Sequence, residues 1–325
     1  MIKFNAANPS VLLLDVALTG LASDEFLVGI DFRPNGFLYG MVANATRTRV
    51  VVINQSGEVI SVGPNSPPTL DSGFGVDFNP VPDRIRLIGN TTTSRRFNPN
   101  DGTLAGTDTN LAYVIGDPAF GAIPSVVHVG YTNSQIGATL TTLFGIDTGT
   151  DTLVRIGGVD GTPSPNLGQV TTIGPIGINA TDFGGFDIQP GTNLGYAALR
   201  VGSSSNVYSI NLTTGAATLL GAIGNGTNTI DGITVSPCPT SAGVEVSGRV
   251  LTPDGRGLRN TVVSMVDSQG THRTATTSSF GYYSFSEVEV GEAYVMSVDS
   301  RRYRFAPRLV QVFDNLTDVD FFGQE

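Results

Sequence analysis

The sequence predicts an all-β protein, with a β-propeller followed by a small Ig-like or prealbumin-like β-sandwich. A phrase of the form Gly-apolar-Asp-apolar-x-Pro recurs at a spacing of 46 to 47 residues, and repeats of ~40–50 residues built from short strands are typical of propeller blades. The 325 residues include 41 Gly and 18 Pro, which favours turns and strands over helices. No segment shows a sustained apolar period of 3.6 residues, so we expect little helix.

The repeated phrase marks the first strand of each predicted blade. Its copies lie at residues 29–34, 75–80, 185–190 and, in degenerate form, 232–237. Between Gly75 and Gly185 the gap exceeds two periods, so one blade must start without the phrase, near Val126. Five blades fit this spacing best, and four or six are the alternatives that the gap leaves open.

A second recurring unit supplies the outer strands of each blade: a strand, an Asn or Asp, a turn containing Gly, and another strand. It occurs at residues 50–62, 144–156 and 207–220, and more weakly at 96–102. Gly provides the positive φ of such a turn, and Asn or Asp accepts local backbone hydrogen bonds.

The two ends of the propeller are expected to form one composite blade. Residues 3–16 contain the outer strand pair without a phrase before it, whereas residues 232–237 contain the phrase without a strand pair after it. The predicted blades are residues 29–63, 75–115, about 125–157, 185–221 and the composite. The propeller then covers residues 1–237.

A change of pattern predicts a second domain. Residues 238–243 read as a short linker rich in Pro and Ser, and residues 244–325 contain short alternating strands, among them 244–250, 262–266 and 294–298. Such strands at regular spacing predict a β-sandwich.

Two family resemblances extend this prediction. Gly248-Arg249-Val250, the Asp254–Leu258 turn and Phe280-Gly281-Tyr282-Tyr283-Ser284-Phe285 resemble the carboxypeptidase regulatory-like domain. That resemblance implies a seven-stranded, prealbumin-like sandwich that serves as a non-catalytic module of secreted bacterial proteins.

Residues 1–237 resemble an uncharacterised bacterial propeller family of unknown function, which is usually exported. The resemblance rests on the three complete phrases, Tyr131-Thr132-Asn133 and Leu153-Val154. Family members begin with a further strand before the one that matches Ile2-Lys3-Phe4. The resemblance therefore implies that the closing blade of this chain is one strand short.

Asp31, Asp77 and Asp187 occupy equivalent positions in the phrase, so a propeller would bring them to a similar radius. One interpretation is a carboxylate ring that holds a cation such as calcium. The interpretation we favour is that each aspartate binds backbone N–H groups of a neighbouring strand, because the other two blades offer no carboxylate there. We therefore predict no cofactor, with calcium as the alternative.

No catalytic motif is recognisable. His128 and His272 lie in different predicted domains, and no HExxH motif, Cys/His cluster or nucleophile–His–acid set can be placed. Cys238 is a lone cysteine, interpreted as inert, with a bond to another chain as the alternative. The sequence predicts a protein that is not an enzyme.

The charge pattern restricts the partners. The net charge of −10 argues against nucleic acid, and no apolar run is long enough to span a membrane. Lys3 is the only lysine, and much of the polar surface must come from Thr, Ser and Asn. We expect an extracellular or cell-surface protein, with a leader absent from this sequence because residues 1–5 lack the apolar core of a signal peptide.

These observations favour a non-enzymatic structural protein that self-associates as a scaffold, adhesive or filament subunit. An incomplete blade exposes backbone groups that a strand of another copy can bind. The expected acceptor residues are Ile2, Lys3, Phe4, Gly232, Ile233 and Val235, and the expected donor residues are Val319, Phe321 and Phe322. A glycan- or peptide-binding module is the alternative, and a hydrolase is less favoured.

Overall fold

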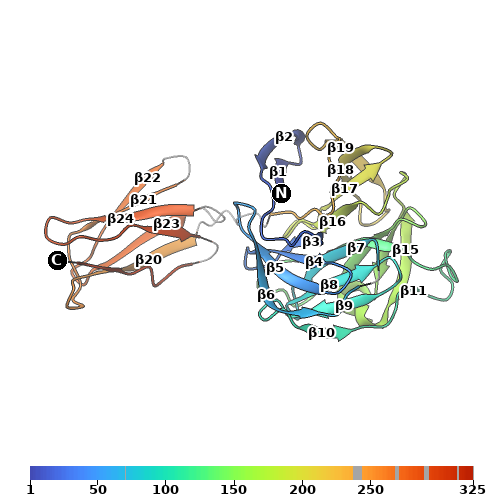
Figure 1. Cartoon of the computed structure of the whole chain (residues 1–325), viewed down its shortest axis with the longest axis horizontal. Helices are drawn as coiled ribbons and strands as arrows, with labels where there is room; N and C mark the ends of the chain where they lie inside the picture. Colours follow the sequence, from blue (N-terminus) through green and yellow to red (C-terminus); the bar gives the residue numbers. More distant parts are fainter. Residues whose placement is uncertain (70, 237–243, 268–270, 289–292, 313–314, 325) are drawn as a thin grey trace. The chain divides into compact units, whose positions relative to one another are not determined.

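The computed structural model describes residues 1–325 except 70, 237–243, 268–270, 289–292, 313–314 and 325. It divides into two compact units, unit 1 (Met1–Pro237) and unit 2 (Cys238–Glu325) (Figure 1). The predicted linker, residues 238–243, and its Cys238 lie outside the described residues. Among the described residues no helix is long and apolar enough to cross a membrane.

Unit 1 contains four large sheets that follow one another along the chain, and their hairpins are antiparallel. The first sheet is β3 (Phe26–Phe32), β4 (Leu38–Ala43), β5 (Thr48–Ile53) and β6 (Val59–Ser66), and the second is β7 (Phe74–Asn79), β8 (Arg84–Gly89), β9 (Ser94–Phe97) and β10 (Leu104–Thr107). The third is β12 (Val126–Tyr131), β13 (Leu143–Asp147), β14 (Thr152–Ile156) and β15 (Gln169–Pro175), and β11 (Ala112–Tyr113) adds a parallel edge strand to β15. The fourth is β16 (Gly184–Ile188), β17 (Gly195–Val201), β18 (Ser204–Ile210) and β19 (Ala217–Ala222). Two short 3-10 helices, Val159–Gly161 and Pro165–Leu167, precede β15.

The outer hairpins form where the turn residues predict them. The Asn54 side-chain oxygen accepts the backbone N–H groups of Ser56 at 3.1 Å and Glu58 at 3.0 Å, and Gly57 adopts a φ of 84°. These bonds close the turn between β5 and β6. Gly102 and Gly215 adopt φ values of 70° and 84° in the corresponding turns of the second and fourth sheets.

The core of unit 1 lies between neighbouring sheets. Met41 of the first sheet packs in one cluster with Phe78 and Phe97 of the second. Ile146 of the third sheet packs with Phe186 of the fourth. The first sheet therefore buries a face against the second, and the third against the fourth.

The first strands of the four sheets form a row of neighbours: β3 contacts β7, β7 contacts β12 and β12 contacts β16. Residues 231–235, here called the inner segment, follow in this row. The inner segment lies against β16, because a Cβ on Gly185 would be 2.4 Å from the backbone nitrogen of Ile233, and against β3, because a Cβ on Gly232 would be 3.2 Å from the nitrogen of Ile30. The row of first strands thus returns to β3.

The N-terminal hairpin is a separate two-stranded sheet of β1 (Ile2–Asn5) and β2 (Asn8–Asp15). The expectation that residues 232–237 would pair with this hairpin in one sheet is not met among the described residues. The inner segment forms no assigned strand, and its hydrogen bonds to β3 and β16 involve side chains. The hairpin and the inner segment instead share an apolar cluster that contains Phe4, Leu12 and Ile233.

Unit 2 consists of two sheets around one core. The three-stranded sheet has the order β23 (Tyr282–Val288), β20 (Val244–Leu251), β26 (Phe321–Phe322), and the four-stranded sheet has the order β22 (His272–Thr276), β21 (Val262–Val266), β24 (Ala293–Asp299), β25 (Arg308–Gln311). Val246 and Phe285 of the first sheet pack with Met265 and Met296 of the second. Two sheets of short strands around one core agree with the all-β fold that the sequence predicted.

Candidate functional site at the centre of unit 1

The candidate site is built from the phrase that recurs along the sequence. Asp31, Asp77 and Asp187 lie on β3, β7 and β16, the first strands of three sheets, and all three are buried. One carboxylate oxygen of each lies within 4.8 Å of one from the others. The sequence predicted that these residues are equivalent, and the row of first strands brings them together.

Each aspartate accepts a hydrogen bond from the backbone of the next member of the row, which is a strand for Asp31 and Asp77 and the inner segment for Asp187. An Oδ of Asp31 accepts the N–H of Phe78 at 2.8 Å, and an Oδ of Asp77 accepts the N–H of Tyr131 at 3.0 Å. An Oδ of Asp187 accepts the N–H of Val235 at 2.5 Å. These bonds agree with the favoured interpretation, in which the aspartates tie neighbouring strands.

The same bonds identify the phrase copy that the sequence obscured. The backbone N–H of Tyr131 donates to Asp77 as that of Phe78 donates to Asp31, so Tyr131 stands at the phrase position of Phe78. Residues 128–133 are therefore the third copy, and Gly130 stands at the aspartate position. A side chain there would crowd the fourth sheet, because a Cβ on Gly130 would be 3.1 Å from Ile188 and 3.3 Å from the Cα of Asp187. The missing carboxylate thus reflects close packing.

Thr234 stands at the aspartate position of the inner segment. Its hydroxyl accepts the N–H of Phe32 at 3.1 Å and donates to a carboxylate oxygen of Asp31 at 2.8 Å. A carboxylate oxygen of Asp187 lies 3.1 Å from the same hydroxyl. Thr234 therefore ties the inner segment back to β3, as the aspartates tie the other strands.

Burial and mutual repulsion oppose ionisation of the three carboxyls. Burial raises the pKa of Asp187 to about 6. Burial and the charge of Asp187 raise the pKa of Asp31, and burial and the charges of both neighbours raise that of Asp77. Carboxyls this close share protons or require a cation.

The cluster fits a calcium ion only in part. Calcium takes six to eight oxygen ligands, whereas this group offers one oxygen from each of three carboxyls within the stated distance. Both oxygens of Asp31 and both of Asp187 accept hydrogen bonds from neighbouring groups. The hydrogen bonds account for the positions of these side chains without an ion.

The glycine of the phrase allows the first strands to approach one another. A Cβ on Gly29 would be 2.8 Å from the side chain of Val76, and one on Gly75 would be 2.9 Å from that of Val129. The central space is correspondingly narrow: a cavity lined by Gly29, Gly75 and Gly185 has a volume of about 10 Å³, roughly that of one water molecule.

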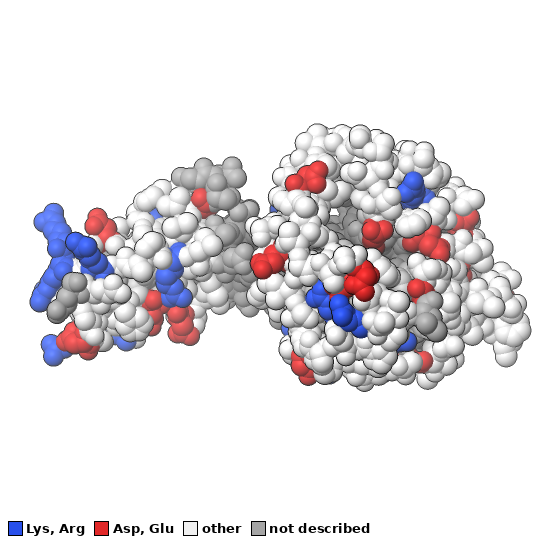
Figure 2. Space-filling view, in the orientation of Figure 1, with Lys and Arg blue, Asp and Glu red and all other residues white. Residues whose placement is uncertain are grey.

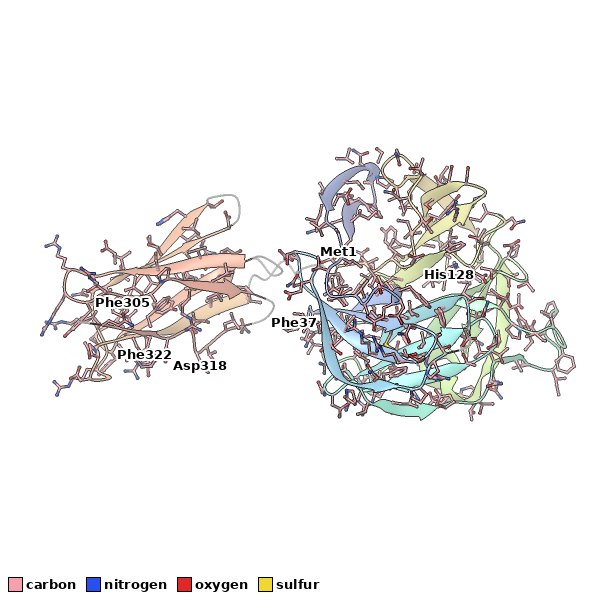
Figure 3. All side chains as sticks on the ribbon, viewed as in Figure 1. Met1, Phe37, His128, Phe305, Asp318 and Phe322 are labelled. Carbon is pink, nitrogen blue, oxygen red and sulfur yellow. The ribbon has the colours of Figure 1, made fainter. Side chains whose placement is uncertain are left out.

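His128 replaces this glycine in the third copy. Its ring is fully buried, Nε2 lies 3.1 Å from the carbonyl oxygen of Thr181, and Nδ1 has no hydrogen-bond partner. Burial lowers the pKa of His128 to about 4, which keeps the ring neutral. Figure 3 labels it within unit 1, whereas His272 lies on β22 of unit 2, so the two histidines are in different units as expected.

Sequence reasoning missed a buried arginine next to the site. Arg86 of β8 is 1% exposed, and its guanidinium donates to Tyr131 at 2.7 Å, Asp108 at 2.7 Å and Asn166 at 2.6 Å. The only signal in the sequence is a charged residue at an inward position of an alternating strand. The network links the second and third sheets beside the strand that Asp77 binds.

The expected acceptor residues lie at the junction between the N-terminal hairpin and the inner segment. Ile2, Phe4 and Ile233 are half-buried against Ala198, Val207 and Ile223. Lys3 is exposed on β1. Gly232 contacts β3, and Val235 contacts Asp187.

The expected donor strand is already used within unit 2. Val319 and Phe321 are 5% and 2% exposed in the core, and Phe321 pairs with Val250 in a parallel bridge. Phe322 is exposed (Figure 3). Donation to another copy would remove Val319 and Phe321 from their own core, so this placement argues against the donor assignment.

Comparisons with known proteins match most of unit 1 to a family model but indicate no activity. The family model described as "Domain of unknown function (DUF4394)" matches residues 1–234. No curated protein matches the chain.

Solved structures give distant similarities. A protein of unknown function from Bacteroides caccae is 12% identical over 69% of this chain and 75% of its own, with a TM-score of 0.39. A protein of unknown function from Bacteroides thetaiotaomicron is 13% identical over 87% and 69%, with a TM-score of 0.40. The Myxococcus xanthus glutaminyl cyclase is 10% identical over 55% and 69%, with a TM-score of 0.35. At these scores the similarities carry no functional argument.

Proposed function

We propose that this chain, which belongs to the DUF4394 family, is a non-enzymatic, extracellular structural protein that self-associates by strand addition. In this proposal unit 1 is a five-bladed propeller whose closing blade is incomplete, and unit 2 is a carboxypeptidase regulatory-like module. The observation that carries the proposal is the N-terminal hairpin, a two-stranded sheet beside sheets of four and five strands.

Repeated contacts at the rim support a fifth blade. Gly63 of β6 lies against the turn at Asp101, since a Cβ on Gly63 would be 1.6 Å from the carbonyl oxygen of Asp101. Gly174 of β15 lies against the turn at Thr214, since a Cβ on Gly174 would be 2.3 Å from the carbonyl oxygen of Thr214. In both cases the outer strand of one sheet meets the outer turn of the next sheet along the chain.

The N-terminal hairpin makes the same contacts on both sides. Gly221 of β19 meets Pro9 at the start of β2, and Gly57 of the first sheet meets Ala17, which follows β2. β2 therefore takes the outermost position of a blade, and β1 takes the position next to it. The inner segment takes the innermost position, and no described strand lies in the remaining position between the inner segment and β1.

The edge of β1 that faces this position carries backbone groups suited to a further strand. Met1 and Val16 exchange both backbone hydrogen bonds, at 2.5 and 2.9 Å. Because bonded and non-bonded pairs alternate in antiparallel sheets, the N–H and C=O of Ile2 point away from β2. An unpaired edge of this kind binds strands of other chains.

The outer strand is also unusual for an exposed edge. Val11 and Leu13 of β2 are 51% and 63% exposed, and the residues that commonly protect edge strands, a proline and a charge, stand only at its ends, Pro9 and Asp15. Both features favour association with other copies.

A proline at Ile2 tests the proposal. Ile2→Pro removes the outward N–H without removing a bond to β2, and Ile2→Val keeps the N–H as the matched control. Light scattering with size-exclusion chromatography, together with electron microscopy, should show assemblies for the wild type and Ile2→Val and monomers for Ile2→Pro. Circular dichroism confirms that the variants are folded. A monomeric wild type at high concentration would refute self-association.

A further inference from the structure

Three connections between strands meet at one end of unit 2. We call this end the basic tip, and it comprises residues 252–261 after β20, 277–281 after β22 and 300–307 after β24. Val262, the first residue of β21, pairs with Thr276 at the end of β22 and with Asp299 at the end of β24, so these strand ends lie together. A Cβ on Gly257 would be 2.0 Å from the carbonyl oxygen of Phe280, which places the first two connections in contact.

The third connection is tied to the first through residues near the C-terminus. Arg304 and Gln324 exchange both backbone hydrogen bonds, at 3.0 and 2.8 Å. The N–H of Gly323 donates to the carbonyl oxygen of Leu251, the last residue of β20, at 2.8 Å. The three connections therefore form one continuous surface.

The basic tip concentrates positive charge in a chain whose net charge is −10. Its exposed charged residues are five arginines and one aspartate, with a further aspartate at its border: Arg256, Arg259, Arg301, Arg302, Arg304, Asp254 and Asp299. Among the described residues, no carboxylate forms an ion pair with Arg301, Arg302 or Arg304. Figure 2 shows basic side chains gathered at the end of unit 2 that holds the C-terminus in Figure 1. These arginines are available to an anionic partner.

An exposed aromatic ring accompanies the arginines. Phe280 is 70% exposed, although its backbone is fixed: its N–H donates to the Ser278 hydroxyl at 3.3 Å, and its carbonyl oxygen accepts from Arg249 at 3.2 Å. Phenylalanine beside basic residues is typical of surfaces that lie at the boundary between lipid headgroups and acyl chains. Guanidinium groups bind phosphate oxygens through two parallel hydrogen bonds.

We infer that the basic tip of unit 2 binds a membrane surface rich in anionic phospholipids. Arg301, Arg302 and Arg304 bind headgroup phosphates, and Phe280 enters the apolar layer beneath them. Phe280 favours a lipid surface over an acidic polysaccharide, because a bilayer can remove the whole ring from water. The inference goes beyond the proposed function, since it concerns unit 2 and does not require self-association through unit 1.

Flotation of the full chain with lipid vesicles tests the inference. The wild type should bind vesicles of phosphatidylcholine mixed with phosphatidylglycerol, less strongly as salt is added, and should not bind phosphatidylcholine alone. The triple variant Arg301→Gln, Arg302→Gln and Arg304→Gln should bind the mixed vesicles at least tenfold more weakly, since each basic side chain near an anionic membrane strengthens binding roughly fivefold. The fold should survive because these side chains are exposed.

A matched variant has the same net charge and an intact tip. Arg84→Gln, Arg155→Gln and Arg200→Gln change arginines of unit 1 that form no ion pair with the described residues, and this variant should bind like the wild type. Equal binding by the tip variant and the wild type, or no binding of the wild type to the mixed vesicles, would overturn the inference. Neither variant changes the β1 edge, so ultracentrifugation tests self-association separately.

A single tryptophan reports whether the ring enters the bilayer. The chain contains no tryptophan, so Phe280→Trp introduces one fluorophore at the tip, and Leu140→Trp places one at a residue of unit 1 that is 52% exposed. The emission of Phe280→Trp should shift to shorter wavelength on addition of the mixed vesicles, and that of Leu140→Trp should not. Vesicle binding without a shift at position 280 would contradict insertion of the tip.

An acidic polysaccharide is the other polyanion that the arginines could bind. Soluble polygalacturonate provides the comparison, with binding measured by calorimetry for the wild type and the tip variant. The inference expects vesicle binding to persist when polygalacturonate is present. Binding of polygalacturonate that requires the three arginines, together with no binding to the mixed vesicles, would assign the tip to a glycan and overturn the lipid inference.

Discussion

The central aspartates of unit 1 combine a structural role with an electrostatic cost. Each accepts a backbone N–H of the next strand, and such bonds to buried donors stabilise the fold. Their oxygens nevertheless lie within 4.8 Å of one another. The protein therefore keeps these strands together with groups that resist ionisation.

The electrostatic cost of burying the three aspartates makes the free energy of unfolding depend on pH. The pKa of Asp187 is raised to about 6, and those of Asp31 and Asp77 are raised well above their usual values. Folded carboxyls with raised pKa values retain protons that the unfolded chain releases, so the free energy of unfolding falls as pH rises from about 4 through 6 and beyond. Glu25, whose pKa Arg49 and Arg47 hold near 2, acts oppositely and stabilises the fold above pH 4.

Asp77→Asn isolates the contribution of the triad. The amide oxygen can still accept the N–H of Tyr131, and one potential charge is removed. At pH 8 we expect unfolding to require more free energy than in the wild type, by on the order of 1 kcal/mol for each unit by which the Asp77 pKa is raised. Urea titrations at pH 4, 6 and 8 measure the slope, and the exposed Asp160→Asn variant is the control. A steeper fall with pH in Asp77→Asn than in the wild type would contradict this account.

The sequence predicted the equivalence of Asp31, Asp77 and Asp187 but not the two remaining positions. Gly130 has no side chain to recognise, and Thr234 replaces a carboxylate with a hydroxyl. Their equivalence becomes visible only through backbone partners such as Tyr131 and Phe32, which depend on strand register. The Arg86 network could not be predicted for a similar reason, because its partners Asp108 and Asn166 lie 22 and 80 residues away in the sequence.

At the level of elements, local turn chemistry was predictable and long-range pairing was not. The turn at Gly57 follows from residues within four positions of one another. The pairing expected between residues 232–237 and the N-terminal hairpin required knowledge of two distant segments. The C-terminal strand shows the same limit, since the alternation of Val319 and Phe321 predicts a buried face without saying which core receives it.

The inner segment is held to β3 by one hydroxyl, which makes Thr234→Val informative. The substitution keeps the shape but leaves the N–H of Phe32 without this acceptor and removes a donor to Asp31. We expect a loss of about 1–3 kcal/mol in the free energy of unfolding, recovered largely in Thr234→Ser. Urea unfolding followed by circular dichroism measures it, with the exposed Thr218→Val as control. If Thr234→Val matched the wild type, the proposed tie between the inner segment and β3 would be wrong.

At the level of the whole molecule, the two units have separate cores. Among the described residues, Val246, Met265 and Phe321 belong to a cluster formed within unit 2, and the clusters of unit 1 are formed by residues of unit 1. Separate cores favour separate functions. In our proposal unit 1 supplies the strand edge through which copies associate.

Separate cores also predict independent unfolding. A core that is complete within unit 2 should allow residues 244–325 to fold alone, although a domain of this size buries only about 60% of its unfolded surface and is of modest stability. Differential scanning calorimetry of the full chain should then show two transitions, one of them at the melting temperature of the isolated fragment measured by circular dichroism. Assembly through unit 1 should raise the other transition as protein concentration increases. The Ile2→Pro variant should abolish that rise and leave the transition of unit 2 unchanged. A single cooperative transition for the full chain, or an unfolded fragment, would show that the units depend on each other.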